Sequence, residues 1–217
     1  MLIVIEGVDG SGKQTQTELL LKKLKDSGKK AVKLTFPNYE GETSALVKMY
    51  LSGKFGKDAD AVNPYAASIF YAADRIGSYL ETWKQYIDND TIVICDRYTT
   101  SNAIHQACKL KGEERDKYLD WLFPFEYDLL GLPKPDHVIF LNMPPEYGEQ
   151  LTKNRANKIT GGETQDIHES NRAYIENSYN SALYTAKKFN WKVIDCVEQG
   201  KIKSIEEINN EITEVLF

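Results

Sequence analysis

The first thirteen residues place the strongest constraint on how this chain folds. Residues 2–5 form an apolar run rich in β-branched side chains, which predicts a strand buried on both faces. A glycine-rich turn ending in Lys13 follows, and a helical pattern begins directly after it. Consecutive backbone N–H groups of such a turn, at the positive end of a helix, can surround phosphate groups. This context favours a phosphate-binding loop over a turn that merely joins strand to helix.

We assign nucleotide binding to this loop and to the residues that open the helix: Gly7, Val8, Asp9, Gly10, Ser11, Gly12, Lys13, Gln14 and Thr15. Gln14 stands where Ser or Thr ordinarily gives a hydroxyl to Mg²⁺, and Thr15 comes one residue late. Because a carboxamide oxygen can still contact the ion or its waters, we predict a changed metal shell that depends more on Asp96 and on nucleotide oxygens.

Length and composition are those of one globular domain, residues 1–217, with 41% hydrophobic and 27% charged residues. The formal net charge of −5 argues against nucleic acid or an anionic membrane as partner, since both require a basic surface. No apolar run approaches the roughly 18 residues of a membrane span. Three cysteines without metal-ligand spacing are expected to be reduced and mostly buried thiols, which suits a cytoplasmic location.

Further strand patterns occur at residues 31–36, 91–95, 138–141 and 192–196, and helical patterns separate them. Each crossover between parallel strands needs a covering helix, so the alternation predicts a three-layer α/β fold with a five-stranded parallel sheet. One helical pattern is long, from the start signal Asn63-Pro64 to about residue 88.

A second chemical cluster, Asp96-Arg97-Tyr98, directly follows the third strand pattern. Ligands of parallel α/β sheets bind at the carboxyl ends of strands, so this cluster and the phosphate loop should open on one crevice. The planar fork of Arg97 suits a phosphate, although a buried ion pair is the structural alternative.

With these motifs in order, the chain resembles the thymidylate kinase family, a group of nucleoside-monophosphate kinases. The matching pieces are residues 6–13, Phe36-Pro37, Asp74-Arg75, Asp96-Arg97-Tyr98 and residues 131–136, and they cover nearly the whole chain. The resemblance implies that Asp9 approaches the sugar hydroxyl, that Tyr39 and Arg97 hold the acceptor phosphate, and that Phe36 flanks their pocket.

The resemblance also assigns base recognition, with Tyr71 stacking on thymine and Arg75 bonding to its O4. Spacing supports this pair independently, because residues four apart lie on one face of a helix. Ser101, Asn102 and Gln106 follow Arg97 on a predicted helix, and Asn102 matches the thymine-reading position. His105 falls where many relatives carry Tyr near the sugar 2′ position, which leaves discrimination against ribonucleotides open.

A polar segment at residues 155–168 has the composition of a mobile lid or of an ordinary surface loop. Arg155 matches the arginine that begins the family's lid, and Asp166 with Glu169 resemble the acidic residues just beyond it. Two departures from the family pattern concern cations and carboxylates: Gly10 replaces an arginine in the loop, and Asn142 replaces an aspartate after the fourth strand.

The resemblance implies an ATP- and Mg²⁺-dependent homodimer that transfers the γ-phosphoryl group of ATP to dTMP, giving dTDP and ADP. Lys13, Asp96, Arg97 and Arg155 are the expected catalytic residues, with Asp96 positioning metal, water or Arg97. Alternatives are another nucleoside-monophosphate kinase, or a deoxynucleoside kinase, which needs a carboxylate base beside a sugar hydroxyl. The alternative outside the enzymes is a nucleotide-binding protein that has lost its catalytic activity. Gln14 and the small number of cationic residues in the lid segment support it.

Overall fold

A central parallel sheet organises the fold, seen in a computed structural model that describes residues 1–56, 58, 60–152 and 172–217. Its strands are β1 (Leu2–Glu6), β2 (Ala31–Thr35), β3 (Ile92–Asp96), β4 (His137–Asn142) and β5 (Lys192–Asp195), in the order β2-β3-β1-β4-β5. All the pairings in this sheet are parallel. The predicted three-layer fold is therefore confirmed, and a short antiparallel hairpin, β6 (Val197–Glu198) with β7 (Lys201–Ile202), adds to it.

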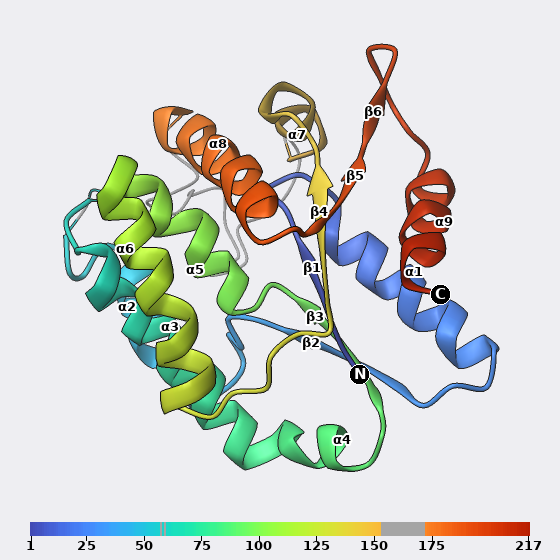
Figure 1. The fold of residues 1–217 in the computed structure, drawn as a ribbon, viewed down its shortest axis with the longest axis horizontal. Helices are drawn as coiled ribbons and strands as arrows, with labels where there is room; N and C mark the ends of the chain where they lie inside the picture. Colours follow the sequence, from blue (N-terminus) through green and yellow to red (C-terminus); the bar gives the residue numbers. More distant parts are fainter. Residues whose placement is uncertain (57, 59, 153–171) are drawn as a thin grey trace.

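Helices cover both faces of the sheet (Figure 1). Helices α1 (Lys13–Asp26) and α9 (Ile205–Leu216) pack together on one side. The other side carries α3 (Pro64–Ser78), α5 (Thr99–His105), α6 (Gly112–Phe123) and α8 (Arg172–Lys188), with α2 (Ala45–Leu51) beside α3. Helix α7 (Pro145–Thr152) follows β4 at the carboxyl end of the sheet, and α4 (Lys84–Asp88) precedes β3.

Alternation along β1 divides the core into two layers, because successive side chains of a strand point to opposite faces. Ile3 and Ile5 pack with buried side chains of α1 and α9. Leu2 and Val4 pack instead with an aromatic cluster that includes Phe36, Trp83 and Tyr98. The fully buried strand pattern that predicted a parallel sheet is thus explained by a packed layer on each face.

The long helical pattern from Pro64 is interrupted rather than uniform. Helix α3 starts where predicted, since the Asn63 side chain caps Ala66 N at 2.9 Å and Pro64 occupies the first turn. A π-helical turn at Tyr79–Trp83 then separates α3 from α4. The turn places Trp83 in the core against Phe36 and Tyr98, with ring centroids 6.0 and 6.2 Å away.

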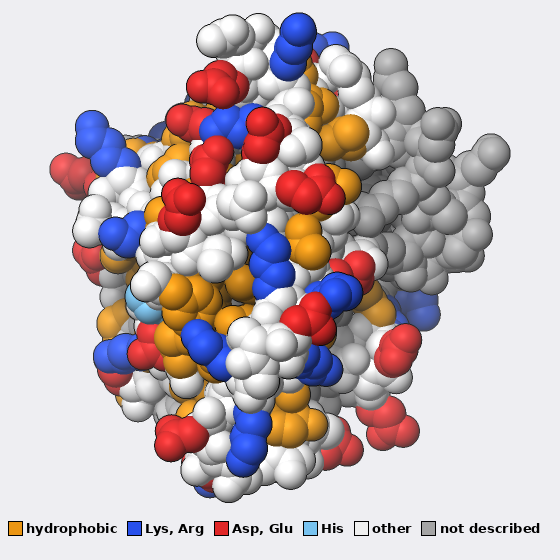
Figure 2. Space-filling view, turned by 90° about the vertical axis from the view of Figure 1, so that its right-hand side faces the viewer, with side chains coloured by type: hydrophobic (Ala, Val, Ile, Leu, Met, Phe, Trp, Pro, Cys, Tyr) orange, Lys and Arg blue, Asp and Glu red, His pale blue; other side chains and the backbone are white. Residues whose placement is uncertain are grey.

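The surface over α1 and α9 carries Lys, Arg, Asp and Glu side chains interspersed with one another (Figure 2). No helix among the described residues is long and apolar enough to cross a membrane. The three cysteines carry unpaired thiols, and Cys95 and Cys196 are buried, as expected from the sequence.

Candidate active site

The phosphate loop connects β1 to α1, as the motif predicts. Gly10 and Gly12 adopt φ values of 82° and 83°, a region that glycine enters without steric cost. Lys13 folds back so that its Nζ donates to the carbonyl oxygens of Gly7, at 2.8 Å, and Val8, at 2.9 Å. Burial, with the nearby Arg97 charge, lowers the pKa of Lys13 to about 8, against the raising effect of neighbouring carboxylates.

Helix α7 packs directly against this loop through two glycines. A Cβ atom added at Gly148 would lie 2.9 Å from the carbonyl oxygen of Asp9, and one added at Gly10 would lie 2.3 Å from that of Gly148. The close backbone approach therefore needs glycine on both sides. The segment predicted as a lid follows α7 in the sequence and lies outside the described residues.

Glu6, at the end of β1, organises the residues that follow β3. Its buried carboxylate accepts hydrogen bonds from the backbone N of Tyr98 at 3.2 Å, from Thr100 Oγ1 at 2.6 Å and from Ser101 Oγ at 2.9 Å. Burial raises the pKa of Glu6, and the Arg97 charge acts in the opposite direction. This role of Glu6 was not predicted from the sequence, where the available signal was a lone carboxylate at the end of an apolar strand.

Arg97 directly follows β3 and has a positive φ of 68°. Its guanidinium contacts Asp9 Oδ1 at 2.6 Å, His105 Nε2 at 2.9 Å and, more distantly, Ser101 Oγ at 3.5 Å. Burial alone would lower the pKa of Arg97, but Asp9 and the other carboxylates nearby raise it, so the cation is retained. Arginine has only donors, which makes His105 Nε2 the acceptor. His105 therefore helps to orient Arg97.

Asp96 ends β3 beside β1, where Ile5 is its register partner. It is 3% exposed, and its charge raises the pKa of both Lys13 and Arg97, so it acts on both cations. Mg²⁺ in phosphoryl-transfer sites is held by one or two carboxylates together with substrate phosphates. Asp96 fits that chemistry. The described residues contain no cluster of three or more His, Cys, Asp or Glu arranged to hold a metal unaided.

The predicted base-binding residues fall into two groups. Arg75 and Asn102 both donate to one buried carboxylate, that of Glu126, a residue not predicted from the sequence to belong to the site. Tyr71 is half-buried beside Tyr50, with ring centroids 6.3 Å apart, on the same helix as Arg75.

The remaining predicted substrate residues have different surroundings. Tyr39 lies close enough to influence the pKa of Arg97. Phe36 is buried in the aromatic cluster, 4% exposed. The buried amide of Gln106 makes no hydrogen bond with any described residue, an arrangement that favours a bound polar group or water there.

Several sequence predictions lie elsewhere. Arg155 and the lid at residues 155–168, with Asp166 and Glu169, fall outside the described residues. Gln14 donates to Glu18 Oε1 at 3.1 Å, and Thr15 is exposed. Asn142 bridges two side chains, donating to Asp195 at 2.7 Å and accepting from Tyr179 at 2.8 Å.

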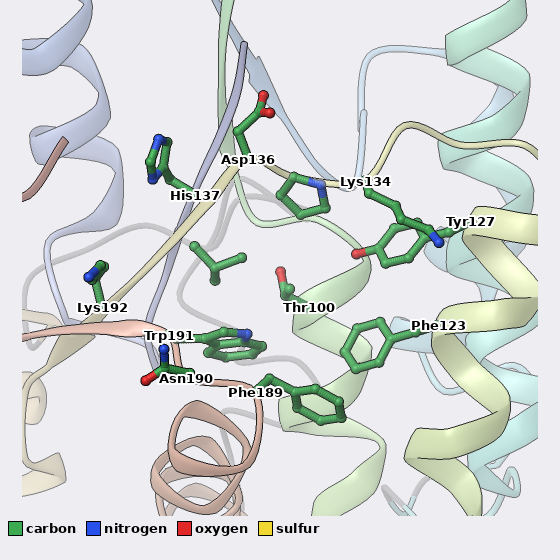
Figure 3. Close-up of a pocket in the computed structure, with 12 residues that line it drawn as sticks. Thr100, Phe123, Tyr127, Lys134, Asp136, His137, Phe189, Asn190, Trp191 and Lys192 are labelled. Atoms are coloured by element: carbon green, nitrogen blue, oxygen red, sulfur yellow. The ribbon is translucent and has the colours of Figure 1, made fainter. Parts of the chain in front are cut away.

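The structure also contains a cavity of about 420 Å³ (Figure 3). Phe123 and Trp191 line it, with His137 and Lys192, which begin β4 and β5. The cavity is therefore at the amino ends of these strands, opposite the phosphate loop. The phosphate loop, Asp96 and Arg97 lie at the opposite, carboxyl ends of the strands.

Comparison with known proteins decides the family. A family model described as thymidylate kinase matches residues 5–212. The chain belongs to the thymidylate kinase family. It is an ATP-dependent phosphotransferase that converts dTMP to dTDP.

Relatives in the family cover most of the chain. The chain is 35% identical over 162 residues to the thymidylate kinase of Mycobacterium tuberculosis (strain H37Rv), covering 74% of each protein. It is 29% identical over 213 residues to that of Homo sapiens, covering 97% of this chain and 87% of the human one. The solved structure of thymidylate kinase from Candida albicans matches with a TM-score of 0.69 and 24% identity, covering 99% of this chain and 90% of that one. This structural likeness supports the fold.

Proposed function

We propose that the crevice at the carboxyl ends of β1 and β3 carries out the transfer from ATP to dTMP. The supporting observation is the convergence of Lys13 in the phosphate loop, Asp96 after β3 and the anchored guanidinium of Arg97. Gly7 to Thr15 bind the nucleotide phosphates, and Lys13 neutralises charge on the transferring group. Arg97 and Tyr39 receive the acceptor phosphate, and Arg155 supplies a further cation from the lid.

The proposed chemistry requires no strong base. The acceptor is a phosphate oxygen of dTMP, and the second pKa of a phosphate monoester is about 6, so the attacking oxygen is already largely ionised at pH 7. Catalysis then consists of alignment and charge neutralisation. Glu6 serves this alignment indirectly, because it accepts hydrogen bonds from Ser101, which contacts the Arg97 guanidinium, and from the backbone of Tyr98, which follows Arg97 in the chain.

Mg²⁺ is the proposed cofactor beside ATP, and it would neutralise phosphate charge during transfer. Asp96 would hold it with nucleotide oxygens and waters. Gln14 lies at the start of α1, where its carboxamide oxygen would contact the ion or its waters.

Tyr71, Arg75 and Asn102 are proposed to select thymine, and Ser101, Gln106, Phe36 and Asp9 to complete the dTMP pocket. A deoxynucleoside kinase, the rival enzyme, needs a carboxylate acting as a base. Asp9, which the resemblance places near the sugar, is instead engaged in an ion pair with Arg97 at 2.6 Å. That engagement favours a phosphate acceptor.

A coupled ADP-release assay over thymidine, dTMP, dUMP and dCMP tests this proposal. We expect turnover with dTMP and little with thymidine. Lys13→Ala should reduce turnover by about 100-fold or more, the scale for removing one group that stabilises transition-state charge, while the fold is retained. Turnover of Lys13→Ala within a few-fold of the unmodified enzyme would refute the loop assignment, and preference for thymidine would favour the rival.

We further propose a cytoplasmic homodimer that pairs through the α3 side. Helix α3 exposes Tyr65 and Ile69 at 38% and 48%, and Leu80 just beyond it is 67% exposed. Apolar side chains in such a row are costly to leave in water. Light scattering should give twice the chain mass, and Ile69→Glu should convert the dimer to a monomer.

A further inference from the structure

Glu126 is a buried carboxylate with no role in the proposed transfer, yet it joins two of the base-reading residues. Its side chain is 0% exposed. Oε2 accepts from Arg75 Nε at 2.7 Å and from Thr99 Oγ1 at 2.8 Å. Oε1 accepts from Arg75 NH2 and from Asn102 Nδ2, the latter at 3.2 Å. Four donors thus saturate a group whose two oxygens offer about four acceptor positions.

The ion pair fixes how Arg75 is presented. Glu126 takes the edge of the guanidinium formed by Nε and NH2. Among the described residues NH1 makes one long contact, 3.5 Å to the carbonyl oxygen of Tyr98. Burial by itself lowers the pKa of Arg75, but the Glu126 charge raises it. Glu126 therefore holds the charged guanidinium of Arg75 so that its NH1 group points away from the carboxylate.

The same carboxylate fixes the polarity of Asn102. Glu126 only accepts hydrogen bonds when ionised, so Asn102 must turn its amide nitrogen toward it. Ser68 O, at 3.5 Å, is also near this nitrogen and is also an acceptor. The amide oxygen of Asn102 is then left to face away, and it accepts no hydrogen bond from the described residues.

A donor from Arg75 beside an acceptor from Asn102 matches one edge of a pyrimidine. Thymine and uracil present O4, an acceptor, next to N3–H, a donor. Cytosine presents the reverse, an amino group next to an unprotonated N3, so both contacts would become unfavourable. The donor–acceptor order of Arg75 and Asn102 therefore discriminates between pyrimidine bases by hydrogen bonding rather than by size.

We propose that Glu126 is a positioning residue that sets the donor–acceptor order of Arg75 and Asn102, and so makes the pocket select 4-oxo over 4-amino pyrimidine monophosphates. This rests on the proposed base-reading role of those two residues.

The local fold around Glu126 supports a specific requirement at this position. Residues Pro124–Leu129 form a π-helical turn that continues from α6. Such turns are rare and occur frequently at functional sites. This one aims a carboxylate inward at α3 and α5, 51 residues from Arg75 and 24 from Asn102 in the sequence.

Glu126→Gln tests the proposal, because the side chain keeps its shape but exchanges one acceptor oxygen for a donor. With the new NH2 group at the Oε1 position, the bonds from Arg75 NH2 and Asn102 are lost, and Asn102 is no longer forced to show its oxygen to the base. With it at the Oε2 position, the bond from Arg75 Nε is lost, and the guanidinium is no longer held by two parallel bonds. We expect the ratio of kcat/KM for dTMP to that for dCMP to fall by about tenfold or more. The dTMP to dUMP ratio should stay within about twofold, since these bases differ only by a methyl group outside the network.

Thr99→Val is the matched control variant. It removes one donor to Glu126 but leaves the carboxylate, both Arg75 bonds and the Asn102 bond. Its melting temperature should fall while its dTMP to dCMP ratio stays as in the unmodified enzyme. A purely structural role for Glu126 would instead lower the activity on all three monophosphates together, with both ratios preserved.

Circular dichroism and thermal unfolding establish that each variant is folded. If Glu126→Gln does not fold, Glu126→Asp decides, because it keeps the charge but cannot span Arg75 and Asn102 together; an intermediate dTMP to dCMP ratio is expected. A folded Gln or Asp variant with an unchanged ratio overturns the proposal, as does failure of both to fold, which would make Glu126 a stability residue.

Asn102→Ala distinguishes failure of the base-reading role from failure of the role proposed for Glu126. If it leaves the dTMP to dCMP ratio unchanged, the base-reading assignment itself is wrong. If it lowers the ratio whereas Glu126→Gln does not, only the role of Glu126 is wrong.

Discussion

Arg97 and Asp9 form an ion pair at 2.6 Å that joins the residue following β3 to the phosphate loop following β1. This contact links the loop proposed to bind ATP to the arginine proposed to bind the phosphate of dTMP. Because Arg97 is mostly buried and Asp9 is about half exposed, the pair can reorganise when an acceptor phosphate arrives. Arg97 then exchanges a carboxylate for a phosphate, both of which suit its fork.

Replacing Arg97 by Lys should be severe, because one ammonium cannot reproduce the fork that reaches Asp9, Ser101 and His105. We expect kcat/KM for dTMP to fall by about ten- to hundredfold, the scale of a lost charge-assisted hydrogen bond. Steady-state kinetics with dTMP titrated at saturating ATP provides the measurement. Asp9→Asn serves as the control and should cost less, since His105 and Ser101 still hold Arg97. Equal losses in both variants would indicate that the pair is only structural.

The pH dependence of ATP use should report Lys13. The pKa of Lys13 is lowered from 10.5 to about 8, so the free enzyme loses this positive charge as pH rises through about 8. kcat/KM for ATP should then fall, whereas kcat at saturating ATP should persist to higher pH, because bound phosphates favour the charged form. A kcat/KM profile that stays flat up to about pH 9.5 would contradict the assignment.

The same shift has a consequence for stability. Between about pH 8 and 10.5 the unfolded chain holds a proton on Lys13 that the folded chain releases, so the contribution of this group to stability rises with pH across that window. Lys13→Met should abolish this rise. Thermal unfolding of both proteins from pH 7 to 10 measures the difference.

Gly148→Ala should weaken ATP binding, because α7 packs against the backbone of the phosphate loop. Its new Cβ would lie 2.9 Å from the Asp9 carbonyl oxygen and would push α7 away from the phosphate loop. We expect KM for ATP to rise several-fold, measured with dTMP saturating. Gly28→Ala is the control, since it also lowers stability through its φ of 79° but meets no atom within 4 Å. Its KM for ATP should not change.

Gln14→Thr should preserve activity and lower the Mg²⁺ concentration needed for half-maximal rate, because it returns a hydroxyl to the first turn of α1. The substitution removes the bond from Gln14 to Glu18, which is exposed and contributes little to stability. Titration of Mg²⁺ at fixed ATP tests this. A folded variant that loses activity would show that Gln14 has a different role.

Local sequence determined the frame of this protein. Short apolar runs marked the strands of the main sheet to within a residue at their ends. The signal was strongest for β1, which is buried throughout its length, and weaker for the edge strands β2 and β5, which are partly exposed. The proximity of the phosphate loop to the residues after β3 could also be predicted, because parallel strands bring their carboxyl ends to one edge of the sheet. The π-helical turns were not visible, because their extra residue is set by what Trp83 and Glu126 pack against.

Only the tertiary structure showed which partners the site residues have. Arg75 and Asn102 were identified from the sequence as base-reading candidates, but the carboxylate that orients both comes from a distant helical segment. In the sequence Glu126 looks like any solvent-facing acid, since local periodicity carries no record of long-range contacts. Glu6 and His105 are similar cases. Glu6 accepts from the backbone of Tyr98 across 92 residues of chain, and His105 accepts from Arg97 across 8. Sequence spacing places a side chain on a face, whereas charge pairing across the core decides what that side chain can offer a ligand.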